Sequence, residues 1–126
     1  MTRCLIIEGR STDDHQLSAM LVAHGFEVER TQLPEHALML CRQRMPDIVL
    51  MPASMPTMSG VMFMQSLKRT RGPSPAVLVC ADEASPMMIS QAIWEGADEC
   101  LVQPFDADIL DFKLRQIGVI AGSVAA

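Results

Sequence analysis

The side chains that could carry out chemistry in this chain are few and widely spaced. Glu8 follows a short apolar run, Cys80 ends another, and Gln103 follows a third. The four cysteines form no CxxC pair and have no histidine beside them at a metal-ligand spacing, so no zinc site is indicated. Neither a glycine-rich phosphate loop nor a nucleophile–base pair is visible. We therefore predict that the chain is not an enzyme and uses no cofactor or metal.

The cysteines and histidines have ordinary structural explanations. Cys4, Cys80 and Cys100 lie in apolar runs and are expected to be small buried residues of a reducing compartment. The three histidines are scattered over two predicted helices, where a surface or packing role is favoured over a phosphorelay role.

Length and charge narrow the class of protein. The 126 residues fit one compact domain, for which we expect the bounds 1–120, with a tail over 121–126. A net charge of −5 argues against nucleic acid as a partner, since that needs a basic surface. The sequence shows no signal segment and no apolar run near the ~18 residues of a membrane span, so a cytoplasmic protein without membrane contact is expected.

Short apolar runs alternate with longer helical patterns along the whole chain. Strands are expected over residues 4–7, 26–30, 48–51, 76–80 and 99–102. Helices are expected from Ser11 to Gly25, over 34–43, after Gly60, over 86–95 and from Asp106 to Gly118. This alternation predicts an α/β, three-layer (βα)5 sandwich of the flavodoxin-like class. Its parallel five-stranded sheet should have the order 2-1-3-4-5 and a site at the carboxyl ends of the strands.

The 3.6-residue period predicts which side chains of the third and fourth helices face inward. These are Val61, Met64 and Leu67 on the third helix and Ile89, Ala92, Ile93 and Gly96 on the fourth. The last helix carries the apolar residues Ile109, Leu110, Leu114 and Ile117. A different face of the fourth helix carries Met87, Gln91 and Trp94 at i, i+4 and i+7. Because Trp is over-represented at contact hot spots, these three form a candidate partner surface. The alternative, in which Trp94 folds down onto the third helix or the sheet edge, stays open.

Several segments resemble the receiver domain of response regulators. Pro46 and Asp47 open the third predicted strand, and Met55, Pro56 and Gly60 close the loop after it, as in the family's Pro-Asp-apolar-Asp-x-x-Met-Pro-x-x-x-Gly. The resemblance covers essentially the whole chain and implies the CheY-like fold and a role in two-component or phosphorelay signalling.

Two further segments carry the same resemblance. Residues 96–105, Gly-Ala-Asp-Glu-Cys-Leu-Val-Gln-Pro-Phe, are similar to the family's Gly-Ala-Asp-Asp-Tyr-Leu-x-Lys-Pro-Phe. Residues 34–38 resemble the usual opening of the second helix. The family's Lys-Pro bond is usually cis, so the resemblance implies a cis Gln103-Pro104 bond.

At the family's functional positions this sequence departs from the pattern. The acidic pair, the phosphoacceptor aspartate, the hydroxyl residue and the lysine correspond to Glu8 with Gly9, Pro52, Cys80 and Gln103. Cys100 stands at the switch position, where the family has an aromatic residue that changes rotamer. One carboxylate is too few for Mg²⁺, and phosphoryl transfer to aspartate needs both the metal and a carboxylate nucleophile. A degenerate phosphorylation pocket is therefore expected. In it, the amide of Gln103 or the side chain of Arg10 should be the polar partner of the Glu8 carboxylate.

These features together predict a stand-alone pseudo-receiver. It is expected to act by protein–protein interaction with a histidine kinase, a phosphotransferase or another regulator, and a homodimer is a further expected assembly. Two alternatives remain open. The emptied pocket with Cys80 could serve as a small-molecule or redox sensor, or the chain could be an atypically phosphorylated response regulator that uses the nearby hydroxyl of Ser54.

Overall fold

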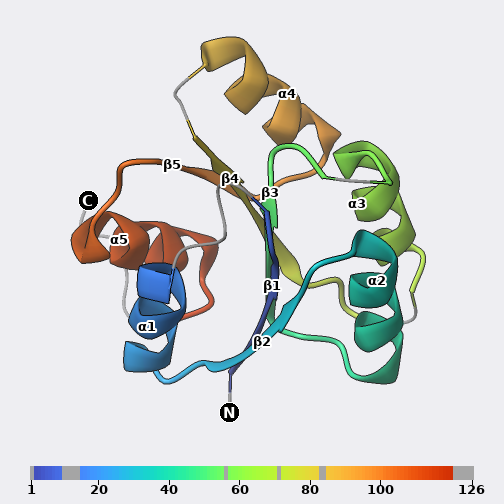
Figure 1. The fold of residues 1–126 in the computed structure, drawn as a ribbon, viewed down its shortest axis with the longest axis horizontal. Helices are drawn as coiled ribbons and strands as arrows, with labels where there is room; N and C mark the ends of the chain where they lie inside the picture. Colours follow the sequence, from blue (N-terminus) through green and yellow to red (C-terminus); the bar gives the residue numbers. More distant parts are fainter. Residues whose placement is uncertain (1, 10–14, 56, 71, 83–84, 121–126) are drawn as a thin grey trace.

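The computed structural model describes residues 2–9, 15–55, 57–70, 72–82 and 85–120 (Figure 1). The strands are β1 (Arg3–Ile7), β2 (Glu27–Thr31), β3 (Ile48–Pro52), β4 (Ala76–Ala81) and β5 (Glu99–Val102). The helices are α1 (His15–Ala23), α2 (Pro34–Gln43), α3 (Gly60–Lys68), α4 (Pro86–Glu95) and α5 (Ala107–Ile117). The expected helix start at Ser11 lies outside the described residues, as does Arg10. None of the described helices has the length and apolar character needed to cross a membrane.

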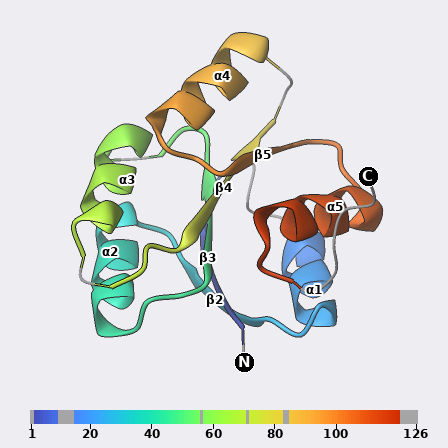
Figure 2. The same cartoon turned by 180° about the vertical axis from the view of Figure 1, so that it is seen from behind.

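All neighbouring strands pair in parallel in the order β2-β1-β3-β4-β5, so the predicted topology is confirmed. Helices α2, α3 and α4 lie on one face of the sheet, and α1 and α5 lie on the other (Figures 1 and 2). Parallel pairing brings the carboxyl ends of all strands to one edge of the sheet, where ligands of such folds bind. The residues that follow β1, β3, β4 and β5 therefore meet there.

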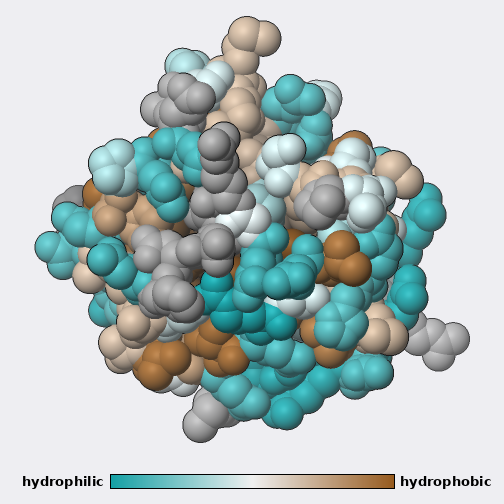
Figure 3. Space-filling model, in the orientation of Figure 1, coloured by the Kyte–Doolittle hydropathy of each residue, from teal (hydrophilic) through white to brown (hydrophobic). Residues whose placement is uncertain are grey.

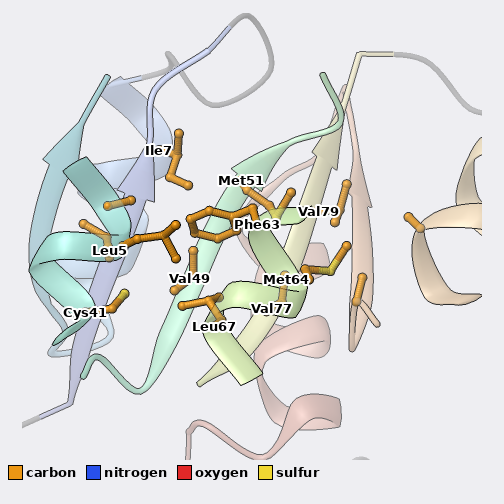
Figure 4. Close-up of a cluster of buried hydrophobic side chains, with 14 of the residues drawn as sticks. Leu5, Ile7, Cys41, Val49, Met51, Phe63, Met64, Leu67, Val77 and Val79 are labelled. Carbon is orange, nitrogen blue, oxygen red and sulfur yellow. The ribbon is translucent and has the colours of Figure 1, made fainter. Parts of the chain in front are cut away.

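Two hydrophobic cores hold the three layers together. On the α2–α3 face, Phe63 lies fully buried between Leu5, Val49 and Leu67, as Figure 4 shows. On the other face, Leu17 and Leu21 of α1 and Leu110 and Leu114 of α5 cover the sheet. Each fully buried side chain of this size contributes about 1.5–3 kcal/mol to folding, so the two cores fix the sheet edge firmly.

Local capping chemistry sets several helix ends as the sequence predicts. The Asp106 carboxylate accepts a hydrogen bond from the Ile109 backbone N–H at 2.9 Å, which begins α5. Ser85 does the same for α4 through the Met88 N–H. Pro34 occupies the first turn of α2, where its missing N–H costs nothing. The Gln103-Pro104 peptide bond is cis, as expected.

The predicted inward faces of the helices are partly wrong. Ile93 is 43% exposed, and Val61 is only half-buried. Phe63, which the sequence analysis does not place on the inward face, is fully buried. An apolar residue that fits the 3.6-residue period can still be exposed when its helix contacts the rest of the protein along a narrow stripe. On α4 only Ala92 is buried, because that helix touches the rest of the protein along a thin stripe.

Candidate functional site

Three of the expected site residues meet at the carboxyl edge of the sheet. Pro52 ends β3 and lies beside Cys80 of β4 in the strand register. Immediately after Pro52, the Ala53 N–H donates to the Cys80 carbonyl at 2.9 Å, which holds the two strand ends together. Gly9 follows β1 and lies against the Pro52 ring. The sequence-based prediction that these positions converge is therefore consistent with the geometry.

The contact between Gly9 and Pro52 leaves no room for a side chain at position 9. A Cβ atom built on Gly9 would lie 2.7 Å from Cγ and 2.9 Å from Cβ of Pro52. Carbon atoms in contact normally stand about 3.5–4.0 Å apart. Pro52 is buried, and its ring is rigid, so it cannot swing aside as a long side chain would. The ring therefore occupies the space into which a carboxylate at position 9 would project.

The carboxylate of Glu8 is paired with a residue that the sequence analysis missed. Arg30, on β2, donates from Nε to Glu8 Oε1 at 2.9 Å, and both side chains are half-buried. A second nitrogen of the same guanidinium donates to the Ser18 hydroxyl on α1. The expected partner Arg10 lies outside the described residues, and the structure gives Glu8 the guanidinium of Arg30 as its ion-pair partner. The order of the strands was the available signal, since β2 lies beside β1 and carries Arg30 one residue before its end.

Cys80 is fully buried among the side chains under α1 and α5. Burial raises the pKa of its thiol far above the ordinary range, with a smaller contribution from Cys4 and Cys100. Since the thiolate is the reactive form of cysteine, this side chain is held in its inert form.

Gln103 follows β5 at the same carboxyl edge of the sheet. Its backbone N–H donates to the Ala81 carbonyl at 2.9 Å. Its side chain lines a cavity of about 370 Å³ together with Gln16, Asp82, Pro104 and Phe105. Neither Gly9 nor Pro52 lines this cavity.

The switch position is occupied by a short, buried side chain. Cys100 of β5 is 3% exposed and packs in the core beneath α4. Burial, followed by the nearby Glu99 carboxylate, raises the pKa of its thiol. A thiol of this size fills its core position and has no ring to carry between a buried and an exposed rotamer.

The candidate partner surface on α4 is exposed, as its spacing indicates. Met87 is 84% exposed and Trp94 is 90% exposed, so the alternative in which Trp94 folds onto the protein is wrong. Gln91 lies between them and donates from Nε2 to Glu95 Oε1 at 3.0 Å. A tryptophan this exposed buries little of its large apolar surface within the described chain.

Several known proteins resemble this chain in sequence or in fold. Protein PilH of Pseudomonas aeruginosa is 30% identical over 115 residues, which covers 87% of this chain and 92% of PilH. A putative response regulator from Chloroflexus aurantiacus has a similar structure, with a TM-score of 0.81 and 21% identity over 92% of this chain and 96% of that one. The receiver domain of Ssk1, solved in complex with the histidine phosphotransfer protein Ypd1 from Saccharomyces cerevisiae, gives a TM-score of 0.76 at 17% identity, over 93% of this chain and 88% of that one.

The family assignment itself rests on the length of sequence that matches. Residues 4–115 match the response regulator receiver domain, a stretch that begins in β1 and ends in α5. This chain belongs to the response regulator receiver domain family.

Proposed function

We propose that this chain is a receiver domain that takes no phosphoryl group on an aspartate and acts by binding other proteins. The observation that carries the proposal is the place of Pro52. It ends β3 at the sheet edge where the family's phosphoacceptor stands, and its ring packs on Gly9. A pyrrolidine ring has no nucleophilic oxygen, so no acyl phosphate forms there.

The donor set at this edge does not fit Mg²⁺. That ion prefers several oxygen ligands in octahedral geometry, with one or two carboxylates among them. Glu8 is the one carboxylate from the matching family positions, and the Arg30 guanidinium occupies one of its oxygens at 2.9 Å. Arginine stays charged at any physiological pH, so this ion pair supplies internally the positive charge that a metal would bring.

The loss of the switch side chains supports a receiver held in one state. In the family, a hydroxyl residue and an aromatic residue couple phosphorylation to the α4–β5–α5 surface. Both positions hold fully or almost fully buried cysteines here, Cys80 and Cys100. Their buried thiols also disfavour a redox sensor, because neither is both exposed and low in pKa.

A protein of the same signalling network is the partner that this proposal favours. The structurally similar Ssk1 receiver domain binds the phosphotransfer protein Ypd1. For this chain we infer a histidine kinase, a phosphotransferase or another regulator as partner, or a second copy of the chain. The surface formed by Met87, Gln91 and Trp94 is the proposed contact, because large exposed apolar side chains gather there.

A first prediction tests the absence of aspartyl phosphorylation. When the purified chain is incubated with acetyl phosphate and Mg²⁺, its intact mass is expected to stay unchanged, because Pro52 provides no acceptor oxygen. A mass gain of one phosphoryl group would contradict the proposal if it is lost in hydroxylamine, which cleaves acyl phosphates. A gain that resists hydroxylamine and disappears in Ser54→Ala would instead support a phosphorylated hydroxyl.

A second prediction tests the partner surface. Trp94→Ala is expected to weaken binding to the cognate kinase or phosphotransferase by about 30-fold, the loss of about 2 kcal/mol that is typical of an interface hot spot. Surface plasmon resonance with the immobilised partner measures the change. Met62→Ala is the matched control, because Met62 is also an exposed apolar residue (57%) but lies on α3. Equal effects of the two substitutions, or none from either, would rule out this surface.

A further inference from the structure

Positive charge without a partner is concentrated in one part of the described chain. Eight lysine and arginine side chains are described, and four of them form ion pairs: Arg3 with Glu29, Arg30 with Glu8, Lys113 with Glu99, and Arg115 with Asp111. The other four form no ion pair in the described structure, although the chain has 15 acidic residues. They are Arg42, Arg44, Lys68 and Arg69.

All four lie at the carboxyl ends of α2 and α3. Arg42 and Lys68 occupy the last turns of these helices, and Arg44 and Arg69 are the C-cap residues. The two helices pack side by side and run in the same direction, so their ends are neighbours (Figures 1 and 2). Attraction to the carbonyl groups at the helix ends, about 0.3–1 kcal/mol for each charge, explains why cationic side chains are found there. This attraction leaves the N–H donors of these side chains available for a ligand.

Two of these four cations, Arg42 and Arg69, line a cleft between the two helices. Its volume is about 500 Å³, and it is lined by Cys41, Arg42, Met45, Ser66, Arg69 and Thr70. Arg42 and Arg69 are exposed, whereas Cys41 is buried and Met45 is half-buried. The cleft therefore offers one guanidinium from each helix region and an apolar floor from Cys41 and Met45. Lys68 lines a different cavity, beside Gly96, and takes no part in it.

We propose that this cleft binds an acidic segment of a protein partner, with carboxylates on Arg42 and Arg69 and an apolar side chain on Cys41 and Met45. The site goes beyond the proposed function, because it is separate from the α4 surface. Guanidinium and carboxylate groups match in charge and geometry. Because the chain has a net charge of −5, the rest of its surface repels an acidic segment. This repulsion favours binding of such a segment at the positively charged cleft.

The surroundings favour spaced carboxylates over a free phosphate. Residues at the carboxyl ends of α2 and α3 line the cleft, and the partial negative charge of these helix ends opposes a compact multivalent anion. An apolar floor gives nothing to a bare inorganic ion but buries an apolar side chain of a peptide. The face of the molecule drawn in Figure 3 is largely hydrophilic, with smaller hydrophobic patches between the polar side chains.

The test uses the full chain and a fluorescein-labelled peptide of alternating glutamate and leucine. Fluorescence anisotropy is expected to show binding that weakens about tenfold in Arg42→Gln/Arg69→Gln, since each neutral substitution removes one charge-assisted hydrogen bond. The matched control is Lys113→Gln/Arg115→Gln on α5, which removes the same total charge from side chains that are ion-paired within the chain. This control is expected to bind within about twofold of the unmodified chain.

Each other outcome overturns the proposal. No binding of the peptide by the unmodified chain removes the site. Equal weakening by both double variants means attraction to overall charge, without a defined cleft. Displacement of the peptide by inorganic phosphate at equal concentration identifies a site for free anions instead of an acidic segment. Because Arg42 and Arg69 are exposed, the double variant should lose no more than the helix-end attraction, about 2 kcal/mol in total, and stay folded, which thermal denaturation checks.

Discussion

Replacing Gly9 with alanine is expected to lower the free energy of unfolding by about 2 kcal/mol while Pro52 is present, within the usual cost of overpacking. The new methyl carbon would lie 2.7 Å from Cγ of Pro52. Neither partner can yield easily, because the proline ring is rigid and sits in the β3–β4 ladder beside Cys80. Urea denaturation, followed by far-ultraviolet circular dichroism, measures the loss.

The same substitution is expected to be nearly neutral once the ring is removed. In a Pro52→Gly background, both atoms that crowd position 9, Cβ and Cγ of residue 52, are absent, so the alanine at position 9 has space. The coupling between the two positions should therefore reach about 2 kcal/mol in a double-mutant cycle. Additive effects of the two substitutions would show that the ring and position 9 do not compete for space.

This coupling links two departures from the family pattern, the glycine at position 9 and the proline at position 52, as one structural change. An acidic side chain at position 9 cannot coexist with the Pro52 ring, so glycine there follows from proline at the end of β3. The residue types alone predict a pocket that is emptied of its functional groups. The geometry instead suggests that the pocket is filled, because the ring takes the space of a side chain.

The fold was accessible from sequence because short apolar runs and caps are local signals. The short apolar run over 48–51 is typical of a buried strand in a parallel sheet. Asp106 caps its helix through neighbouring backbone N–H groups, whatever the helix packs against. The side chains that face the sheet are harder to predict. Ile93 and Ile109 fit the helical period yet stay exposed, because the width of the buried stripe depends on how closely each helix approaches the sheet.

From the sequence, only the positions that form the candidate site could be predicted, and the contacts between their side chains could not. Resemblance placed Glu8, Gly9 and Pro52 at one edge, but the partner of Glu8 comes from β2, 22 residues along the chain. No spacing rule links the two, and only the sheet order brings Arg30 beside Glu8. The close approach of Gly9 to Pro52 is a matter of ångströms, which residue types alone do not specify.

Restoring the family's residues is expected to restore phosphorylation. The variant Gly9→Asp/Pro52→Asp/Gln103→Lys removes the ring, returns two carboxylates to the sheet edge and adds the lysine. With acetyl phosphate and Mg²⁺ it should gain one hydroxylamine-sensitive phosphoryl group, because a carboxylate nucleophile and a metal site then stand together. Intact mass spectrometry measures the phosphorylated fraction, which is zero for the unmodified chain under the proposal.

The matched control carries asparagine instead of aspartate at position 52. Its carboxamide has almost the same shape but is a poor nucleophile, so no phosphoryl group should be added. A folded aspartate variant that also stays unmodified would contradict the assignment of position 52, unless Arg30 is responsible. Adding Arg30→Met decides this, because it frees the Glu8 oxygen that now lies 2.9 Å from the guanidinium. Phosphorylation that appears only after this change would show that the ion pair, as well as the proline, keeps the domain unphosphorylated.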